Sequence, residues 1–528
     1  MSAQPLRIER KEPQTIQAKG KTTRDKIEKT FTEEIVLAIC APIGSLKDKV
    51  ISTLEDKIKL YNYDIQIISL SQFIIDHFKK KHEPIKGKTE AFSKLKHKIE
   101  GGNSLREEFK NRSLLAELAI KEINLDRNQA FTREGELPLA TEIASRRKCY
   151  IIDSLKNKEE LLLFRSIYKD LFYSFSVFSP KNERFNKLQS IGLSIDEIKE
   201  LMLIDDYEDN KFGQDVRNTF VEADFFIRVS DKNVDQLSAK IERYLHIIFE
   251  SNVVTPYHDE YAMYVAKSAA GNSACLSRQV GASIMSKDGI ILSKGWNDVP
   301  KFQGNLYSEQ DGVKDKRCFH DGFCSNDKMK DDLTSKIIDL IKEDSTFKEM
   351  WGANFDKTIG ELNQLIRNSR VKDLIEFSRS VHAEMHAIIT GSQVCGEKIR
   401  GSKLFTTTYP CHNCARHIIV SGITEVYYIE PYAKSLGIDL HSDAITEDEI
   451  EPNKVRLLLY DGVAPRRYLE FFSKSRDRKD QKGIKINHDL TKIGPKFKMT
   501  LQALSTLEQQ AIHSLNESGF INEQQEAK

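Results

Sequence analysis

This sequence has almost no excess of one charge over the other, few cysteines and no long apolar runs. The 528 residues include 80 lysines and arginines against 79 aspartates and glutamates, which leaves a net charge of +1. Because this balance produces no strong field around the molecule, composition gives no indication of nucleic-acid binding. Eight cysteines in a chain of this length indicate a reducing compartment rather than a framework of disulfides.

The lack of long apolar runs argues against a membrane protein. No run approaches the length of a membrane span, and the first residues, MSAQPLRIERKEP, lack the apolar core of a signal peptide. We therefore expect a cytoplasmic protein without a membrane segment. The length is too great for one hydrophobic core and predicts about two to four domains.

Two short runs in the C-terminal half carry the most specific chemical signal. VHAEMHAI contains H-x-E, and TYPCHNCARHII contains P-C-x-x-C. His382, Cys411 and Cys414 offer one imidazole and two thiolates, a set that leaves the fourth tetrahedral position of zinc open, as in catalytic sites. Glu384 is expected to move protons rather than to bind the metal. The combination is typical of zinc-dependent nucleobase deaminases.

Other interpretations of these residues stand beside this one. A C-x-x-C pair alone also occurs in structural zinc knuckles and redox sites, but its combination with H-x-E, each at the start of an apolar helix, favours catalysis. A catalytic zinc lowers the pKa of a bound water from about 15.7 to about 7. His386, one turn after His382, is expected to pack or to form hydrogen bonds. His412 is expected to lie beside the ligands without binding the metal.

Near the N-terminus, an apolar run at 35–40, a loop and a helical pattern resemble the opening of a P-loop nucleotide or nucleoside kinase. Such a loop needs glycines that let backbone N–H groups approach phosphate, a lysine, and a Ser or Thr for magnesium. The corresponding stretch holds Ala41, Gly44, Ser45, Leu46, Lys47 and Asp48. Lys47 fits the pattern, but Asp48 at the Ser/Thr position would repel phosphate. We therefore expect a kinase-derived domain that binds a nucleotide weakly or serves as a scaffold, rather than one that turns over ATP.

The rest of this half alternates apolar and helical segments. Asp153 ends the apolar run at 148–155, where either a Walker-B-type carboxylate or a helix cap would lie. Alternating strands and helices predict a parallel sheet with right-handed crossovers. Further segments are predicted as a strand running into a helix (63–75), a helix then a strand (161–180), a charged helix then a strand (205–229), and a helix (237–249).

The second half begins with a helix at 257–270 and strands at 280–285 and 290–295. The helix with His382 follows, and then a strand and a helix around the cysteines, which gives the order α-β-β-α-β-α of the cytidine deaminase fold. The fold class is therefore α/β, a P-loop-like parallel-sheet domain followed by a cytidine-deaminase-like α/β/α domain. The expected parts are a flexible basic arm (1–31), the kinase-like domain (32–250), the deaminase domain (251–472, with an insertion at about 301–380), and a basic tail with a C-terminal helix (473–528).

Several runs resemble deoxycytidylate deaminases over roughly residues 255–470, among them ACLSRQVGASI, GWNDVP, HAEMHAI and TTYPCHNCARHIIVSGITEVYYI. The pairing with a degenerate kinase-like domain resembles the fused deoxycytidylate deaminases of bacterial anti-phage defence. This resemblance implies deamination of dCTP and dCMP, depletion of the deoxycytidine nucleotide pool during infection, and inhibition by a small RNA in some systems. It also implies a dimer or hexamer.

The same resemblance suggests substrate contacts. Asn297 matches an asparagine that contacts the deoxyribose, although a turn-forming role is an equal alternative. Arg278 matches an arginine near the phosphate, a role suited to its guanidinium, with a surface salt bridge as the alternative. Tyr432 lies where the family often has an aromatic residue over the pocket. Ala383 is expected to contact the base through its backbone.

The insertion contains KRCFHDGFCSND, in which Cys318, His320 and Cys324 are candidate ligands of a second, structural zinc. Some phage-type relatives carry such a site. The alternative is a loop packed with reduced cysteines, because no fourth ligand is evident. Helices predicted at 333–342 and 359–366 are expected to pack on the rim of the active site or on another subunit.

Residues 473–498 are rich in lysine and arginine and have almost no aromatic residues. A solvated tail is one interpretation and a strip that contacts RNA is the other. The chain then continues into one amphipathic helix and a frayed end.

The sequence as a whole predicts hydrolytic deamination of a free deoxycytidine nucleotide. The main alternative is a deaminase that acts on cytosine or adenine in single-stranded nucleic acid, which would require a basic groove with stacking aromatics. A third possibility is a nucleotide kinase with a regulatory deaminase fold, against which the degenerate loop argues.

Overall fold

The computed structural model describes residues 22–78, 84–132, 143–206, 212–432 and 435–520. The chain divides into two compact units, one that runs to Val254 and resumes at Ser473, and one from Thr255 to Phe472. Most of the predicted flexible arm and the frayed end lie outside the described residues. The described part of the arm forms a short capped helix, α1 (Thr23–Glu28). None of the described helices is both long and apolar enough to cross a membrane.

A parallel sheet forms the centre of the first unit, with its strands in the order β5-β4-β1-β3-β2. Every residue of the central strand β1 is buried, because helices cover both faces of the sheet. The predicted parallel α/β fold of this unit is therefore confirmed, while its relation to P-loop kinases stays a prediction. The strands are β1 (Ile35–Cys40), β2 (Asp64–Ser69), β3 (Lys148–Asp153), β4 (Phe172–Phe178) and β5 (Phe225–Arg228).

The helices of this unit follow the predicted segments, with one exception. Within 205–229, where the sequence predicts a charged helix, α8 ends at Asp206, residues 207–211 lie outside the described part, and the only further helix among the described residues of this segment is the five-residue α9, which precedes β5. The helices are α2 (Lys47–Lys59), α3 (Leu70–Phe78), α4 (Glu90–Glu108), α5 (Leu114–Gln129), α6 (Lys158–Tyr168), α7 (Lys181–Ser190), α8 (Ile195–Asp206), α9 (Val216–Phe220), α10 (Val234–Phe249) and α20 (Leu501–Glu517).

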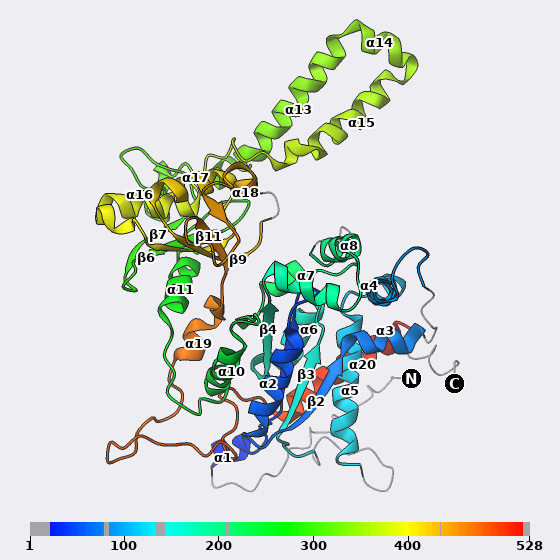
Figure 1. The fold of residues 1–528 in the computed structure, drawn as a ribbon, viewed down its shortest axis with the longest axis vertical. Helices are drawn as coiled ribbons and strands as arrows, with labels where there is room; N and C mark the ends of the chain where they lie inside the picture. The colour runs from blue at the N-terminus through cyan, green and yellow to red at the C-terminus, as the bar shows by residue number, and fades with distance from the viewer. Residues whose placement is uncertain (1–21, 79–83, 133–142, 207–211, 433–434, 521–528) are drawn as a thin grey trace, which may run out of the picture. The chain divides into compact units, whose positions relative to one another are not determined.

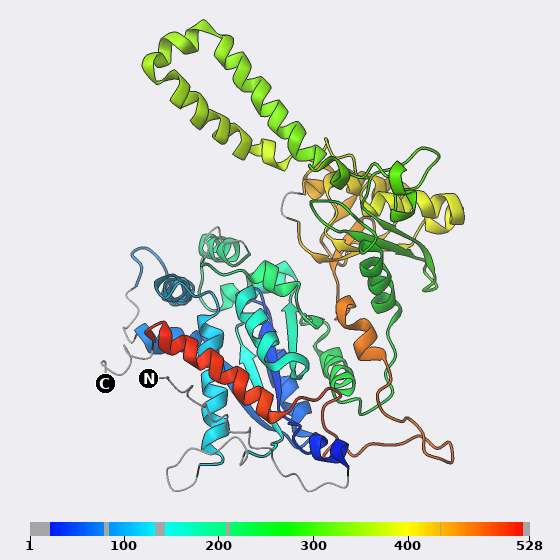
Figure 2. The ribbon, with the colours of Figure 1, turned by 180° about the vertical axis from the view of Figure 1, so that it is seen from behind.

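The helix α20 is not a separate tail but part of the first unit. It lies along α5 and α6, as Figure 2 shows in red, and Leu504 and Leu515 enter the same core as the buried residues of α5. Glu508 is completely buried and forms an ion pair with Arg127, which also binds Glu34 at 2.6 Å. The segment before α20 is also anchored, since Arg476 donates to the carbonyl of Phe249 at 2.7 Å.

The second unit is built on a six-stranded mixed sheet in the order β10-β11-β9-β8-β6-β7. The hairpin β6–β7 is antiparallel, β6 pairs antiparallel with β8, and the strands beyond β8 run parallel. The predicted order α-β-β-α-β-α is confirmed by α11, β6, β7, α16, β8 and α17. The elements are α11 (His258–Ala270), β6 (Gly281–Met285), β7 (Ile291–Trp296), α16 (Ala383–Cys395), β8 (Lys403–Thr408), α17 (His412–Ser421), β9 (Glu425–Glu430), α18 (Gly437–Leu440), β10 (Ile445–Thr446), β11 (Val455–Leu459), β12 (Gly462–Val463) and α19 (Tyr468–Phe472).

The insertion between β7 and α16 forms a helical arm. Its helices are α12 (Cys318–Asp321), α13 (Ser325–Glu343), α14 (Ser345–Trp351) and α15 (Phe355–Asn368). The helices α13 and α15 run antiparallel and contact each other, and the arm extends away from the sheet of its unit (Figure 1). Both helices predicted in the insertion are therefore present, and only the base of the arm meets the candidate site.

Candidate functional site

The candidate site lies where two helices of the second unit begin. His382 is the N-cap of α16, and Cys411 is the N-cap of α17, with Cys414 in the first turn of the same helix. Helix N-termini favour negative charge, which suits thiolates. The helix α16 packs closely on β7 because Gly295 has no side chain: a Cβ there would come within 2.3 Å of the carbonyl oxygen of Ala383. This close packing fixes the position of the imidazole.

The three predicted ligands converge. The Nδ1 atom of His382 lies 3.2 Å from the Sγ of Cys411 and 3.3 Å from the Sγ of Cys414. All three ligand atoms lie within 4.8 Å of one another, as required for one metal ion. An imidazole and two thiols are a donor set that zinc prefers, and three protein ligands leave one position for water or substrate. The residues present therefore fit a catalytic zinc.

The electrostatics of the cluster agree with metal binding. The pKa of Cys411 is lowered to about 4, first by the hydrogen bond from the Cys414 thiol and then, against the opposing effect of burial, by the hydrogen bond and charge of His382. Burial is the main reason that the pKa of Cys414 is raised. The first of the two thiols is thus readily ionised and can bind a cation without a strong base.

Glu384 follows His382 by two residues and points into the same cluster. Its side chain is 4% exposed, and its Oε2 lies 3.4 Å from the Sγ of Cys414. Burial raises the pKa of this carboxyl above its usual range, and the negative charge of Cys411 raises it further. A carboxyl of raised pKa exchanges protons near neutral pH more readily than an exposed one, which suits the predicted role.

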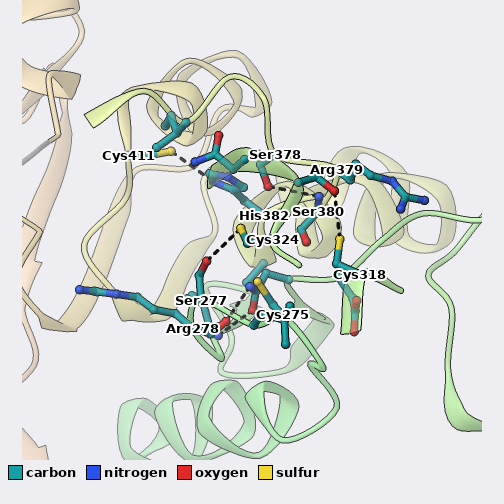
Figure 3. Close-up of a pocket in the computed structure, with 18 of the residues that line it drawn as sticks. Cys275, Ser277, Arg278, Cys318, Cys324, Ser378, Arg379, Ser380, His382 and Cys411 are labelled. Carbon is teal, nitrogen blue, oxygen red and sulfur yellow. Dashed lines mark hydrogen bonds between the residues drawn. The ribbon is translucent and has the colours of Figure 1, made fainter. Parts of the chain in front are cut away.

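A cavity of about 340 Å³ opens onto His382, Glu384 and Cys411. The structure places the predicted substrate residues Arg278, Asn297, Ala383 and Tyr432 in its wall. Figure 3 shows His382 and Cys411 pointing toward each other on one side of this cavity and Arg278 reaching outward on another. A cavity of this size suits a small ligand.

Two of the predicted substrate contacts are already engaged within the protein. The Asn297 amide donates to the carbonyl of Arg278 at 2.8 Å and accepts from the backbone of Val280 at 2.7 Å, so it shapes the chain that carries Arg278. The half-exposed Arg278 pairs with Glu430 at 2.6 Å, and its guanidinium lies 5.9 Å from the centre of the Tyr432 ring. A phosphate would therefore compete with Glu430 for this guanidinium.

The base of the helical arm also lines the cavity, in agreement with the expectation that the helices of the insertion pack on the rim of the active site. The buried Lys330 of α13 donates to the carbonyl of Lys372 at 2.9 Å, and Asn326 donates to that of Leu374 at 3.1 Å. These bonds tie α13 to the segment that leads into α16. The residues that line the cavity, Asn326 and Lys330, lie in the part of α13 that precedes the helix predicted at 333–342.

The candidate second zinc site is not assembled. The Nε2 atom of His320 lies 3.0 Å from Asp315, while the thiols of Cys318 and Cys324 lie near Ser325 (3.5 Å) and Ser277 (3.6 Å). Among the described residues, the three side chains do not meet at the distances that one ion requires. Each of the eight cysteines is a free thiol. The alternative of reduced cysteines packing a loop is the better description.

The two histidines that were set aside as metal ligands do have other roles. The Nδ1 of His386 accepts from the backbone of Trp296 at 3.2 Å, and its Nε2 lies 3.2 Å from the side-chain oxygen of Asn305. His386 thus ties α16 to the chain around Trp296 and Asn305, which confirms the predicted hydrogen-bonding role. His412 lies 3.4 Å from a carboxylate oxygen of Glu376 and does not belong to the cluster.

In the first unit, the predicted P-loop residues lie together but bind one another. Lys47 forms an ion pair with Asp153 and donates to the Ser154 hydroxyl at 2.8 Å. Gly44 has a φ of +80°, and a Cβ there would come within 2.8 Å of the Arg184 carbonyl oxygen. The cap of the helix that follows β3 is Asn157 and not Asp153, so that alternative is wrong, while a Walker-B-type role of Asp153 stays a prediction. Nucleotide binding at this loop stays a prediction.

Comparison with known proteins finds a similarity within the second unit. Residues 256–430 match the family model of the cytidine and deoxycytidylate deaminase zinc-binding region. These residues of the second unit are similar to the zinc-binding region of that family. The matched residues include His382, Cys411 and Cys414, so the predicted type of enzyme, a deaminating hydrolase, and the predicted metal are supported by both the match and the geometry.

Individual relatives cover only part of the chain. The ComE operon protein 2 of Bacillus subtilis (strain 168) is 37% identical over 79 residues, which are 14% of this chain and 40% of that protein. The deoxycytidylate deaminase of Enterobacteria phage T4 is 26% identical over 178 residues, 33% of this chain and 78% of that protein. The dCMP deaminase of the cyanophage S-TIM5, solved in apo form, shares 21% identity over 39% of this chain and 100% of its own, with a TM-score of 0.21.

Proposed function

We propose that the second unit catalyses the zinc-dependent hydrolytic deamination of free deoxycytidine nucleotides, dCMP or dCTP, to the deoxyuridine nucleotides. The observation that carries this proposal is the convergence of His382, Cys411 and Cys414 beside the buried Glu384 at the end of a cavity. The names of the phage relatives support the choice of a deoxycytidine nucleotide.

The chemistry follows from the residues around the cavity. Zinc, when held by the three ligands, supplies a Lewis acid that activates water at neutral pH. Glu384 accepts one proton from water as its oxygen adds to C4 of the cytosine ring and passes this proton to the ring nitrogen. It then moves the second proton, from the C4 hydroxyl, to the amino group, which departs as ammonia as the C4 carbonyl forms. Water and a cytosine nucleotide are consumed, and ammonia and a uracil nucleotide are released. Arg278, Asn297, Ala383 and Tyr432 are proposed to hold the nucleotide, with Arg278 near its phosphate.

The direct test compares substrates and one variant. We expect the purified protein to release ammonia from dCMP or dCTP and to leave a single-stranded oligonucleotide unchanged. In Glu384→Gln the carboxyl that moves the proton is replaced by an isosteric amide. We expect kcat to fall by about 10²–10⁴-fold, while the zinc content measured by mass spectrometry stays the same.

Two outcomes would contradict the proposal. Turnover of the oligonucleotide but not of free nucleotides would favour the alternative of a nucleic-acid deaminase. Turnover that survives Glu384→Gln would remove Glu384 from the mechanism. Glu361→Gln, which changes an exposed carboxyl of α15 outside the cavity lining, serves as the control and is expected to leave kcat unchanged.

The biological part of the proposal rests on the resemblance alone. We propose that the enzyme depletes deoxycytidine nucleotides during phage infection, that it acts as a homo-oligomer, and that a small RNA holds it inactive beforehand. The test is to measure nucleotide pools in infected cells that carry the wild type or Glu384→Gln. A fall in dCTP and dCMP with the wild type alone is expected, and equal pools in both strains would contradict it.

A further inference from the structure

The first turns of α13 place two polar side chains in the wall of the deaminase cavity, which is the cavity that opens onto Glu384. Asn326 and Lys330 lie four residues apart, so both side chains are on one face of the helix, and both line the cavity. We propose that this face of α13 recognises the part of the nucleotide outside the base: Asn326 accepts a hydrogen bond from the 3′-hydroxyl of the sugar, and Lys330 binds the phosphate. This inference rests on the proposed deamination of free deoxycytidine nucleotides.

The side-chain oxygen of Asn326 is a buried acceptor without a partner. The amide nitrogen of the same side chain donates to the carbonyl of Leu374 at 3.1 Å. The oxygen is buried, and no described residue donates a hydrogen bond to it. Because buried polar atoms normally have partners, we expect a donor from a ligand in the cavity. The C4 amino group of the substrate must lie at the metal ligands, which leaves the hydroxyl of the sugar as the donor.

The other asparagine of the cavity is less available to the sugar. The side-chain oxygen of Asn297 already accepts from the backbone of Val280 at 2.7 Å, and its nitrogen already donates to the carbonyl of Arg278 at 2.8 Å. A hydroxyl would have to share these atoms with the backbone that they hold in place. Asn326 offers an acceptor without disturbing such a bond, which makes it the better partner for the 3′-hydroxyl.

Lys330 is a buried ammonium group with donors to spare. Its side chain is 7% exposed, and its Nζ donates to the carbonyl of Lys372 at 2.9 Å. Its ionic partner among the described residues is Asp327, which lies 3.7 Å away in the same cavity wall and is itself 56% exposed. An ammonium group has three donors, and a buried charge is unfavourable unless it is paired. A phosphate oxygen in the cavity would accept from the remaining donors and compensate the charge.

The N-terminus of α13 adds to the preference for an anion at this place. The helix is 19 residues long, and no side chain caps its start at Cys324. Uncapped N–H groups and the helix dipole favour a negative group there. The Sγ of Cys324 lies 3.6 Å from the hydroxyl of Ser277, so the loop that carries Arg278 adjoins this helix end (Figure 3). A phosphate at this junction would lie in the part of the cavity that both Arg278 and Lys330 line.

The first test removes the acceptor and the hydroxyl separately. Whichever of dCMP and dCTP the wild type deaminates is compared with its 2′,3′-dideoxy analogue, which lacks the 3′-hydroxyl. We expect the wild type to prefer the deoxynucleotide by about tenfold or more in kcat/KM, because the analogue leaves the buried acceptor unpaired. In Asn326→Leu we expect this preference to fall below about twofold, because the acceptor is gone.

The second test removes the ammonium group. In Lys330→Met we expect KM for the nucleotide to rise by about tenfold or more with little change in kcat, because the phosphate is bound equally before and during the reaction. Deoxyuridine, a competitive inhibitor without a phosphate, should have an inhibition constant within about twofold of that for the wild type. A purely structural role of Lys330 would weaken the binding of both compounds equally.

Matched controls lie on the exposed side of the same helical arm. Lys336→Met on α13 and Asn363→Leu on α15 change exposed residues outside the cavity wall. Both are expected to keep the kcat/KM of the wild type and its preference for the deoxynucleotide. Because Asn326→Leu and Lys330→Met also break bonds to the segment before α16, zinc content and circular dichroism check that each variant folds.

Two results would overturn the inference while leaving the proposed function intact. One is that the preference for the deoxynucleotide is absent in the wild type or survives in Asn326→Leu. The other is that Lys330→Met weakens the binding of the nucleotide and of deoxyuridine to the same extent, or of neither. Failure of the wild type to deaminate either nucleotide would instead contradict the proposed function, and the inference with it.

Discussion

His386 illustrates how a single side chain can matter to the site without touching the metal. It lies one turn beyond His382, stacks edge-on against Trp296 at 4.7 Å, and bonds to the chain on both ring nitrogens. Burial lowers the pKa of this imidazole from its ordinary value of 6.5. The folded protein therefore favours the neutral imidazole, in which Nδ1 accepts a hydrogen bond and Nε2 donates one.

At the residue scale, we predict that His386→Leu lowers the free energy of unfolding by about 1–3 kcal/mol but leaves the zinc content unchanged. A lowered pKa in the folded state means that the unfolded chain binds the proton more tightly. The stability that the wild type owes to neutral His386 is therefore present above pH 6.5 and falls as the pH drops below it. The variant should show a weaker dependence over that range in chemical denaturation.

The control is His513→Leu, which changes an exposed histidine of α20. It is expected to alter neither the stability by more than about 0.5 kcal/mol nor its dependence on pH. Loss of zinc from the His386 variant would assign His386 a direct part in holding the metal.

At the scale of the elements, β7 and α16 pack so closely that the position of Gly295 has no room for a side chain. A Cβ at Gly295 would lie 2.3 Å from the carbonyl oxygen of Ala383 and 2.4 Å from the backbone nitrogen of Ala387. Real Cβ atoms do not approach backbone atoms so closely. We predict that Gly295→Ala displaces α16 and removes zinc and activity together, as measured by metal analysis and by ammonia release.

Gly360 in α15 provides the matched comparison, because a Cβ there meets nothing within 4 Å. Gly360→Ala should keep full zinc content and raise the stability of the helical arm by about 0.5–1 kcal/mol, the usual difference between the two residues inside a helix. Equal behaviour of the two variants would mean that the β7–α16 contact is not as tight as described.

The helix α20 is the second element for which one residue decides the packing. Glu508 is fully buried between Arg127 and Asn124. Burial lowers the pKa of Arg127, but the charges of Glu508 and Glu34 outweigh this effect and hold that pKa well above its usual value. Removing one partner leaves a buried charge without full compensation. We predict that Glu508→Ala costs about 3–5 kcal/mol of unfolding free energy, measured by denaturant unfolding.

Glu517 near the end of α20 is exposed, and its ionic partner among the described residues is the exposed His513. Glu517→Ala should therefore change stability by about 0.5 kcal/mol or less. A small loss for Glu508→Ala would show that α20 detaches from α5 easily and contributes little to the first unit.

At the scale of the whole molecule, each of the two units has a hydrophobic core of its own. The core of the first gathers residues of β1, β3, α5, α6 and α20, whereas that of the second surrounds the metal ligands. A metal that binds only the folded state stabilises the unit that holds it. We predict two calorimetric transitions, of which a chelator lowers only one, by about 5 °C or more.

A variant supplies the control for this prediction. In Cys411→Ala the transition of the metal-binding unit should occur at the lowered temperature even without chelator. Adding chelator should then change the temperature of neither transition. A single transition that moves with zinc would contradict the independence of the two cores.

The sequence by itself determined the metal ligands, because His382, Glu384, Cys411 and Cys414 act through spacings of two and three residues at helix starts. It also determined most strands and helices, since apolar periodicity is local. Only the tertiary structure decided that α20 returns to the first unit, that Lys330 and Asn326 line the deaminase cavity, and that Asp205 accepts from the backbone of Ile43 in the loop after β1. These contacts join residues far apart in the chain. The pattern of side chains along one segment does not indicate which distant segment will pack against it.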